Sequence, residues 1–499
     1  MKKDAAVTKF GRRAVLGFLM FGVAEAALAN APATSLRPAQ KPRGAVKQAA
    51  KRTVQGADAL IKDANLGGKV GFVVADARTG QVLEAHNPQA TLPPASVMKA
   101  LTTLYALDRM GAGRRFKTQL IATGPVKNGV LRGDLILKGG GDPTLTSDDL
   151  NAMAGRLKAA GVTSVRGKLR VHGGMSVIDQ IDREQPEHVG YNPAVAGLNL
   201  NYNRVYLDWR RTSNGYALKM DGRTNKIRPG VGFAKTTVAA RSLPVFKYSG
   251  QGGKDNWSVA NKALGKAGGR WLPVRRPEIY AGDVLQTVAR SNGVTLPFPV
   301  KSSGAPRGKV LVEHNSAEVG VIARDMLKFS TNLTAEVLGL QASGAGTIRA
   351  SARSMTDWLK SKHGIQKAKL VDHSGLGDAS QLSAQEMVKT LVGAGANGQL
   401  RSILKFIPVR DNDHKVVQNS ATKVVAKTGT LNFVSALAGY IRTPDGRDLA
   451  FAMFMADVPR RKALKKSERE SPRGSRSWNG RAKRLQSKLI NRWAVLHSS

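Results

Sequence analysis

The sequence predicts an α/β (α+β) domain whose two halves are separated by a β-rich insertion. Strand-like segments stand near both ends of the chain, at residues 70–88 and in runs at 423–431, 435–442 and 448–457. Apolar residues three and four apart, the spacing of helices, precede the later strands. From about residue 116 to about 300, short apolar runs are broken by Gly, Pro and Asn, with few helical patterns. One or two smaller β-rich domains are therefore expected inside the α/β domain.

The elements of the α/β domain can be placed in order. Residues 70–88 indicate two strands joined by a turn at 78–81. Residues 444–446, Pro-Asp-Gly, favour a turn between the last two strands. Helices are expected in five segments: 97–107, 316–330, 334–343, 383–395 and 485–496.

These patterns divide the chain. The expected parts are a signal peptide at 1–29, a basic linker at 30–56, the first part of the α/β domain at 57–115, the inserted β-rich domains at 116–300 and the second part of the α/β domain at 301–499. Within the last part, residues 459–484 are rich in Lys and Arg and are expected to form a flexible basic loop.

The composition of the 499 residues bounds the class of protein. An apolar content of 41% fits a globular chain. The formal net charge of +43 would attract an anionic cell wall or membrane surface in a salt-dependent way. Cysteine is absent, which excludes disulfides and thiolate metal sites.

The N-terminus predicts export. Residues 1–13 are basic, residues 14–24 form a short apolar run, and small residues allow cleavage after Ala29 or Ala31. No later segment has the roughly 18 uninterrupted apolar residues that a membrane span needs. A periplasmic protein is expected, by the Sec or the twin-arginine route, and no nucleic-acid partner is expected.

A serine and a lysine stand at the start of the first expected helix. In "PPASVMKALTTLY", residues 93–105, Ser96 and Lys99 are three apart, which places both side chains on one helical face. An isolated Ser-x-x-Lys is most simply a capping serine beside a solvated lysine. The interpretation therefore depends on partners elsewhere in the chain.

Two later motifs supply those partners. Ser330-Thr331-Asn332 lies between two helical segments, and Lys427-Thr428-Gly429 lies on a strand, followed by Thr430. Ser-x-x-Lys, Ser-x-Asn and Lys-Thr-Gly in this order are the motifs of serine enzymes that react with penicillin. Each triplet alone is weak evidence, and their conjunction in the required contexts is strong evidence.

The residue types suit acyl transfer. Ser96 needs a base, and Lys99 can serve if a neighbouring cation such as Lys427 keeps it neutral. Asn332 could orient Lys99, and Ser330 could pass a proton to the departing amine. Lys427 would stay charged to hold a substrate carboxylate.

The residues around these groups are assigned to substrate binding. Thr428 would bind the substrate carboxylate together with Lys427. Gly429 would let a peptide lie close to the strand, where a side chain would intrude. The backbone N–H groups of Ser96 and Thr430 would form an oxyanion hole, an effect worth about 2.7–4 kcal/mol per donor.

The chain resembles the low-molecular-mass class C penicillin-binding proteins, the penicillin-binding protein 4 type of D-alanyl-D-alanine carboxypeptidase/endopeptidase. Beyond the three motifs, the resemblance rests on residues 133–145, 314–336 and 372–377, and it runs from about 57 to 457. A long insertion between the first two motifs is a further trait of this family. One departure is Gly377-Asp378, where members often have Ser-Arg, an arginine that helps to hold the peptide stem.

The resemblance implies a serine β-lactamase/transpeptidase-like peptidase domain interrupted by two smaller domains. It also implies acylation of Ser96 by a peptide ending in D-Ala-D-Ala, release of D-alanine and hydrolysis. Cleavage of crosslinks is the same chemistry with a different leaving amine. Peptidoglycan peptides are the implied partners, β-lactams are the implied covalent inhibitors, and no cofactor is implied.

Three alternatives were weighed. A serine β-lactamase shares the motifs but not the long insertion, and no Glu-x-x-Leu-Asn motif lies between Ser330 and Lys427. A non-catalytic cell-wall-binding protein of the same fold would not need all motif residues. Metal catalysis is disfavoured, because the eight histidines form no His-Glu-x-x-His motif. Asp142 is interpreted as a turn residue of the insertion.

Overall fold

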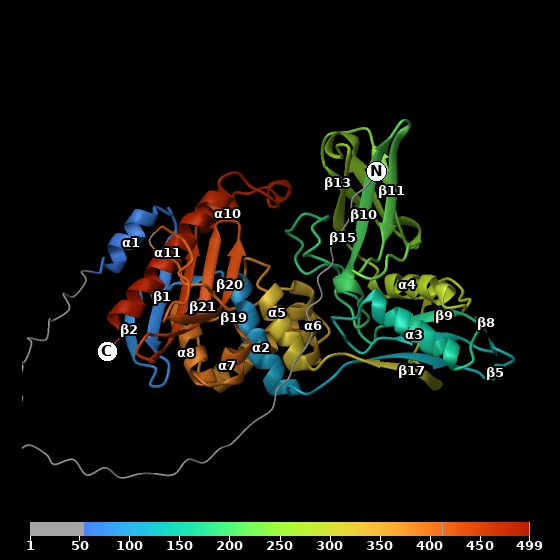
Figure 1. Cartoon of the computed structure of the whole chain (residues 1–499), viewed down its shortest axis with the longest axis horizontal. Helices are drawn as coiled ribbons and strands as arrows, with labels where there is room; N and C mark the ends of the chain where they lie inside the picture. Colours follow the sequence, from blue (N-terminus) through green and yellow to red (C-terminus); the bar gives the residue numbers. More distant parts are fainter. Residues whose placement is uncertain (1–53, 412, 499) are drawn as a thin grey trace, which may run out of the picture. The chain divides into compact units, whose positions relative to one another are not determined.

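A six-stranded antiparallel sheet joins the two ends of the described chain (Figure 1). The computed structural model describes residues 54–411 and 413–498. The strand order is β19-β20-β21-β22-β1-β2, so that an early strand, β1, pairs with a late one, β22. The strands are β1 (Lys69–Asp76), β2 (Val82–His86), β19 (Lys405–Phe406), β20 (Lys423–Leu431), β21 (Val434–Arg442) and β22 (Asp448–Ala456).

Helices cover both faces of this sheet, which explains why its central strands are apolar on both sides. In β22, Ala452 and Phe454 belong to the core shared with α2 and α8, whereas Phe451 and Met453 belong to the core shared with α1 and α11. The helices of this part are α1 (Ala57–Ala64), α2 (Met98–Met110), α5 (Val319–Phe329), α6 (Asn332–Ser343), α7 (Ile348–His363), α8 (Ala384–Ala394), α9 (Gln399–Ile403), α10 (Val458–Lys462) and α11 (Ser475–Leu496).

The expected elements of this part are present. The strand pairs β1–β2 and β21–β22 and the strand β20 lie where the strand-like segments and turns of the sequence placed them. Helices α2, α5, α6 and α8 fall within one to three residues of the expected segments. The closing helix α11 begins earlier than expected, at Ser475, and α7 was not expected. A two-stranded sheet of β3 (Thr91–Leu92) and β18 (Leu382–Ser383) completes this part.

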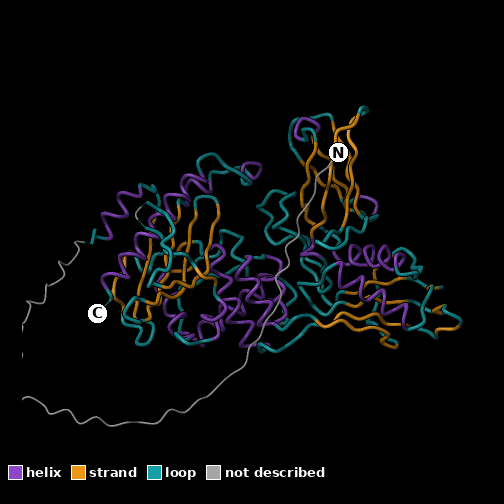
Figure 2. Tube along the Cα trace, viewed as in Figure 1, coloured by secondary structure: helices purple, strands orange, loops and turns teal. Residues whose placement is uncertain are grey.

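The inserted region is built on a five-stranded sheet of order β16-β9-β7-β4-β17. Two helices pack on this sheet, in a region that is otherwise rich in strands, as expected (Figure 2). Their signals were local: Thr146 and Asp149 form a capping box, and Pro277 stands in the first turn. The elements are β4 (Lys117–Ala122), β7 (Leu135–Lys138), α3 (Ser147–Ala159), β9 (Leu169–His172), α4 (Pro277–Ser291), β16 (Pro299–Lys301) and β17 (Lys309–Asn315).

The expected end of the insertion at residue 300 falls inside this sheet. Strand β17 pairs with β4 in antiparallel register from Lys309–Ala122 to Asn315–Lys117. Because both strands belong to the inserted region, we propose that the insertion ends near residue 315.

Smaller sheets complete the inserted region. A three-stranded sheet has the order β11-β10-β15, another has the order β12-β14-β13, and a third has the order β5-β6-β8. Their strands are β5 (Val126–Lys127), β6 (Val130–Leu131), β8 (Ser164–Val165), β10 (Arg204–Thr212), β11 (Gly215–Asp221), β12 (Ala234–Ala239), β13 (Phe246–Ser249), β14 (Asp255–Ala260) and β15 (Ala267–Pro273).

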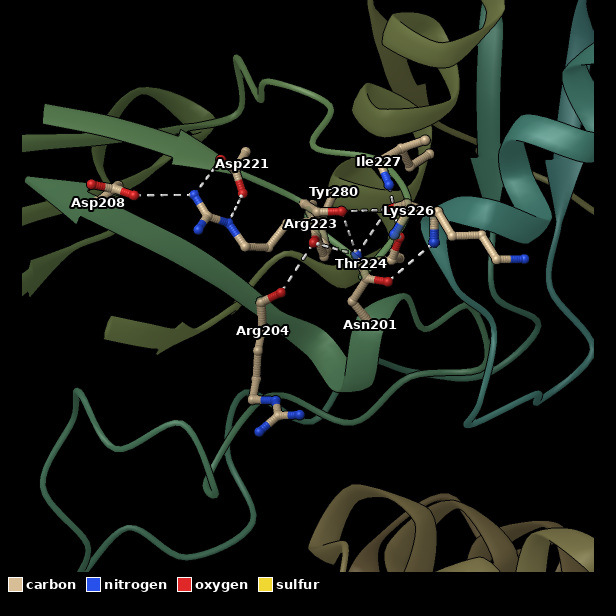
Figure 3. A network of polar contacts seen from close by, with 11 residues as sticks. Asn201, Arg204, Asp208, Asp221, Arg223, Thr224, Lys226, Ile227 and Tyr280 are labelled. Atoms are coloured by element: carbon tan, nitrogen blue, oxygen red, sulfur yellow. Dashed lines mark hydrogen bonds and ion pairs between the residues drawn. The ribbon is translucent and has the colours of Figure 1, made fainter. Parts of the chain in front are cut away.

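Buried polar contacts tie these sheets to helix α4 (Figure 3). The amide of Asn201 donates to the hydroxyl of Tyr280 at 2.9 Å, and that hydroxyl donates to the carbonyl of Arg204 at 3.0 Å. Arg223 forms ion pairs with Asp221 and Asp208. Since Tyr280 is fully buried, its hydroxyl needs these partners, and the network fixes α4 against the start of β10.

The basic segment 459–484 is not the flexible loop that was expected. It contains α10, a short 3-10 turn at Lys466–Glu468 and the first ten residues of α11. Arg461 and Trp478 are buried, and the indole of Trp478 donates to the carbonyl of Leu66. Packing of these side chains therefore orders a segment whose composition resembled a linker.

The expected signal peptide and most of the basic linker lie outside the described residues. Among residues 54–411 and 413–498, no helix has the length and apolar character needed to cross a membrane.

Candidate active site

Ser96 lies in a tight turn at the entrance to α2. Residues 95–97 form one turn of 3-10 helix that leads directly into α2. Ala95 has a φ of 46°, a left-handed conformation that is energetically unfavourable for any residue other than glycine. Such strained residues are concentrated at functional sites. Gly375 packs so closely on this turn that an added Cβ would lie 1.9 Å from the carbonyl oxygen of Ala95. The turn holds the half-buried Ser96 at one end of a buried helix.

Lys99 lies beneath Ser96 and is fully buried. Its Nζ atom donates to Ser96 Oγ at 3.0 Å, to Asn332 Oδ1 at 2.8 Å and to the carbonyl of Ser374 at 2.7 Å. Burial lowers the pKa of Lys99 to about 8, although the carboxylates of Asp372 and Glu336 oppose this shift. A lowered pKa makes the neutral amine, the form that can accept a proton, accessible near neutral pH.

The second motif lies at the junction of two helices. Helix α5 ends at Phe329, Ser330 adopts a left-handed conformation with φ of 59°, and α6 begins at Asn332. This break places Ser330 and Asn332 on the cleft. The Nδ2 group of Asn332 donates at 3.0 Å to the carbonyl of Tyr191, a residue of the inserted region.

Lys427 on β20 brings the third motif into contact with the second. Its Nζ atom donates to Ser330 Oγ at 3.0 Å and to the carbonyl of Thr428 at 2.8 Å. Burial, with further contributions from Lys99 and Lys405, lowers the pKa of Lys427 to about 6.

The pKa values differ from the expected protonation states. Lys427 was expected to stay charged and Lys99 to be neutral, yet in this ligand-free structure the pKa of Lys427 is the lower of the two. The reason is the distribution of acids: Asp372 and Glu336 stabilise the charge of Lys99, and the groups that shift the pKa of Lys427 include no acid. A bound carboxylate would provide that missing negative charge.

Gly429 also has a packing role. An added Cβ at Gly429 would lie 2.8 Å from the carbonyl oxygen of Pro94 and 3.1 Å from the Cβ of Ala95. The glycine therefore lets β20 contact the turn that carries Ser96. Thr428 and Thr430 are exposed on the same strand.

The edge of β20 beside the cleft is open. Among the described residues, strand β19 pairs only with Val425 and Ala426, and residues 427–431 have β21 as their single neighbour in the sheet. A free strand edge offers backbone groups to an extended peptide. Residues of the first two motifs, Ser96, Ser330 and Asn332, line one cleft of about 300 Å³ together with Thr430 of β20. Lys427 joins this site through its contact with Ser330.

The sequence analysis missed the buried carboxylates behind Lys99. Glu336 accepts hydrogen bonds from the backbone N–H of His373 and Ser374, and burial, with the nearby Asp372, raises its pKa to about 8. Asp372 is the first residue of the stretch 372–377, which resembles the family but gives no sign of this contact with Glu336.

The sequence analysis also missed residues at the far end of the cleft. Arg461, Arg469 and Glu470 of the basic segment line it, together with Gln185 and Tyr191 of the inserted region. Their positions depend on contacts across the chain, so no local pattern could identify them.

Asp142 and the histidine His373 lie outside this chemistry. Asp142 accepts from the backbone and hydroxyl of Thr144, which is the turn role expected. His373 is buried against Ser351, and desolvation lowers its pKa to about 3, so its ring is neutral. In the described part of the chain, no three His, Cys, Asp or Glu side chains are placed to hold a metal ion.

Comparison with known proteins identifies the family. The D-Ala-D-Ala carboxypeptidase 3 (S13) family matches residues 54–472. A D-alanyl-D-alanine carboxypeptidase from an Actinomadura species is 31% identical over 435 residues, which is 79% of this chain and 79% of that protein. The carboxypeptidase DacB of Haemophilus influenzae is 24% identical over 414 residues, which is 78% of this chain and 85% of that protein.

A solved structure agrees with the fold. Penicillin-binding protein 4 from Haemophilus influenzae superposes with a TM-score of 0.69 at 20% identity, covering 87% of this chain and 99% of that chain. The expected transpeptidase-like domain with insertions is thereby confirmed. The chain belongs to the D-Ala-D-Ala carboxypeptidase 3 (S13) family.

Proposed function

We propose that this D-Ala-D-Ala carboxypeptidase acts through an acyl-enzyme on Ser96, with Lys99 as the base. The observation that carries the proposal is the 3.0 Å contact between Lys99 Nζ and Ser96 Oγ, made by a buried amine with a lowered pKa. Ammonium has three N–H groups, and Lys99 has three acceptors. After loss of one proton, the lone pair can face Ser96 while Asn332 and the carbonyl of Ser374 hold the amine in place.

The first half-reaction transfers the peptide to the serine. Ser96 Oγ attacks the carbonyl carbon of the penultimate D-alanine, and its proton passes to Lys99. The bond between that carbon and the amide nitrogen then breaks. The departing amine of D-alanine takes the proton of the Ser330 hydroxyl, and charged Lys427, which donates to that hydroxyl at 3.0 Å, replaces it. Lys99 then releases its proton to solvent, and Lys427 regains one from solvent. In the second half-reaction Lys99 takes a proton from the water that attacks the ester and passes it to the departing Ser96 Oγ, which leaves the peptide with a free carboxyl group.

Substrate binding is assigned to the open edge of β20. The C-terminal carboxylate of the peptide would pair with Lys427 and Thr428, and its negative charge would raise the pKa of Lys427 again. That charge on Lys427 in turn favours the neutral form of Lys99. The N–H groups of Ser96 and Thr430 would stabilise the oxyanion.

The substrates would be peptidoglycan stem peptides, and crosslinks would be cleaved by the same chemistry. A second structure of penicillin-binding protein 4 from Haemophilus influenzae contains a β-lactam. That complex supports the proposal that β-lactams are covalent inhibitors of this protein. Export to the periplasm and peripheral contact with an anionic wall or membrane surface rest on the basic, signal-like N-terminus and the net charge of +43.

The test combines intact-mass spectrometry with a product assay. Incubation with benzylpenicillin should add the mass of one molecule, and a peptide ending in D-Ala-D-Ala should release D-alanine. Ser96→Ala should lose both while remaining folded by circular dichroism. A retained adduct in Ser96→Ala would disprove the assignment, and rapid penicillin hydrolysis without D-alanine release would indicate a β-lactamase instead.

A further inference from the structure

The loop behind Lys99 connects this lysine to a buried aspartate. Lys99 Nζ donates to the carbonyl of Ser374 at 2.7 Å, and the N–H of the same peptide group, that of Gly375, donates to Asp372 Oδ1 at 3.0 Å. We propose that Asp372 is a positioning residue for the base: through this one peptide group it fixes an acceptor of Lys99, and it supplies the negative charge that balances the ammonium form. The inference rests on the proposed function, in which Lys99 is the base.

Asp372 holds the loop through three hydrogen bonds. Besides the N–H of Gly375, its carboxylate accepts from the N–H of Gly377 at 2.9 Å and from Ser380 Oγ at 3.2 Å. Asp372 is only 3% exposed, and Ser380 is fully buried. Because donors to a carboxylate favour its charged form, these three contacts let Asp372 keep its charge away from solvent.

The backbone of the loop is held between two helices. The N–H groups of His373 and Ser374 donate to the carboxyl group of Glu336 on α6, at 3.1 and 2.9 Å. The carbonyl groups of the same two residues face α2, where they accept from Thr102 Oγ1 at 2.7 Å and from Lys99. The carbonyl of Ser374 therefore cannot turn away from Lys99 without breaking contacts on both sides.

The same loop supports the turn that carries the nucleophile. Gly375 has a φ of 69°, and an added Cβ there would lie 1.9 Å from the carbonyl oxygen of Ala95, which precedes Ser96. Since Asp372 holds the N–H of this glycine, its hydrogen bond acts on the turn of Ser96 as well as on the acceptor of Lys99. A shift of the loop would move nucleophile and base, and about 1 Å of such movement costs about a hundredfold in rate.

The two buried acids differ in the charge that they carry. Burial lowers the pKa of Lys99, and Asp372 and Glu336 raise it again. Burial raises the pKa of Asp372, but the backbone N–H groups that it binds and the charge of Lys99 oppose this shift. Burial, with the charge of Asp372, raises the pKa of Glu336 to about 8. Near neutral pH, Glu336 therefore holds a proton and Asp372 carries the charge.

The other titratable groups around Lys99 in the described part of the chain supply no negative charge. Lys427 of β20 is basic, and burial lowers its pKa to about 6. His373 is neutral, because desolvation lowers its pKa to about 3. Its ring stacks on Tyr105 of α2, and burial raises the pKa of that phenol. Replacement of Asp372 by a neutral residue should therefore destabilise the ammonium form of Lys99.

The test follows kcat/KM against pH for a peptide ending in D-Ala-D-Ala whose C-terminal carboxylate is replaced by a carboxamide, so that charged Lys427 is not needed. In the wild type the rate should level off near pH 8, the pKa of Lys99. Asp372→Asn should lower the level rate about tenfold or more and move its onset about one pH unit or more towards acid. Asp372→Glu keeps the charge but displaces the loop, so only the rate should fall.

The matched control is Asp283→Asn. Asp283 is also buried and accepts two backbone N–H groups, but it stands on α4 of the inserted region and is not among the groups that act on Lys99. This variant should leave rate and onset unchanged. Infrared difference spectra give a second readout: at pH 6 a band of a protonated carboxyl group should disappear in Glu336→Gln and persist in Asp372→Asn.

The outcomes separate this inference from the proposed function. A folded Asp372→Asn variant with an unchanged level rate, or with an onset still near pH 8, would overturn the role of Asp372, since a merely structural defect lowers the rate without moving the onset. Loss of a carboxylate band instead of a protonated band in Glu336→Gln would also overturn it and needs no variant of Asp372. Absence of a penicillin adduct on Ser96 in the wild type would overturn the proposed function as well.

Discussion

Gly429 lies so close to Pro94 that a single methyl group at Gly429 would stand 2.8 Å from the carbonyl oxygen of Pro94. Pro94 precedes the strained turn that presents Ser96, and Gly429 stands on the strand that carries Lys427. The distance between nucleophile and substrate-binding strand is therefore set by the absence of a side chain at one position.

Gly429→Ala should lower the rate of acylation by about a hundredfold, because a shift of about 1 Å in catalytic geometry has that effect. The rate can be measured with a chromogenic β-lactam. Gly346→Ala is the control, since a Cβ there meets no atom within 4 Å. An unchanged acylation rate in a folded Gly429→Ala variant would contradict this account of the glycine.

Local patterns were sufficient to predict the parts of the site that each motif holds within itself. Ser96 and Lys99 share one helical face, and Ser330 and Asn332 share one helix junction, so spacing alone placed each pair. Five of the six strands of the central sheet also followed from strand-like segments and turns, but the short strand β19 and the pairing of β1 with β22 did not.

What the sequence could not predict depends on contacts between distant segments. Arg461 binds Asp378, and Glu470 binds His188. The partners in each pair are far apart in the sequence, so no periodic pattern of residues links them. The order of the two lysine pKa values was also missed, because it depends on the buried Glu336 and Asp372 behind Lys99. The composition of segment 459–484 predicted a flexible loop because it is rich in Lys and Arg. The segment is folded because Trp478 and Arg461 are buried against the rest of the protein.

The exposed lysines of the basic segment should promote binding to anionic surfaces. Since the segment is folded into the protein, its deletion is a poor test, and Lys462, Lys465 and Lys466 should instead be changed to Gln together. At about 1 kcal/mol per lysine near an anionic surface, retention on isolated cell wall should fall about tenfold or more at low salt.

The matched control neutralises three exposed lysines of the inserted region, Lys219, Lys235 and Lys247. Retention of both variants should converge at high salt, where the charges are screened. If the first triple variant binds the wall as well as the wild type at low salt, the charge of this segment has no part in adhesion. A separate variant lacking residues 30–53 tests the basic linker in the same assay.

The two lysines should give a flat-topped pH profile. Acylation by a peptide needs neutral Lys99 and charged Lys427, whose pKa values in the free enzyme are about 8 and about 6. Below pH 6 the rate should rise with pH as Lys99 loses its proton. Between 6 and 8 the gain in neutral Lys99 is offset by the loss of charged Lys427, and above 8 the rate should fall.

This profile can be checked as kcat/KM against pH for a peptide ending in D-Ala-D-Ala. A peptide whose C-terminal carboxylate is replaced by a carboxamide does not need charged Lys427, so its rate should keep rising until about pH 8 and then level off. Identical profiles for the acid and the amide would show that Lys427 does not bind the carboxylate.

Replacement of the buried Glu336 should change the upper end of that profile. Glu336 is fully buried, and its negative charge is one of the two that raise the pKa of Lys99 against desolvation. Because the pKa of Glu336 is itself raised to about 8, this charge is present only near and above pH 8. Glu336→Gln keeps an acceptor for the N–H of Ser374 and removes that charge, so that the rate for the amide peptide should level off at a lower pH while its rise below pH 6 is unchanged. Glu386→Gln is the control, because Glu386 is also a buried carboxylate that accepts two backbone N–H groups but does not act on Lys99.

The same substitution has a consequence for stability whose sign is fixed by linkage. The pKa of Glu336 is raised from 4.5 to about 8, so its contribution to stability is fully present below pH 4.5 and is lost as pH rises towards 8. Glu336→Gln cannot ionise, and its free energy of unfolding relative to the wild type should therefore improve between pH 5 and pH 8. Urea unfolding at several pH values measures this difference. If instead the free energy of unfolding of the wild type gains on that of Glu336→Gln as pH rises, Glu336 is a stabilised carboxylate in the folded protein. Its charge would then raise the pKa of Lys99 at every pH at which the enzyme is active.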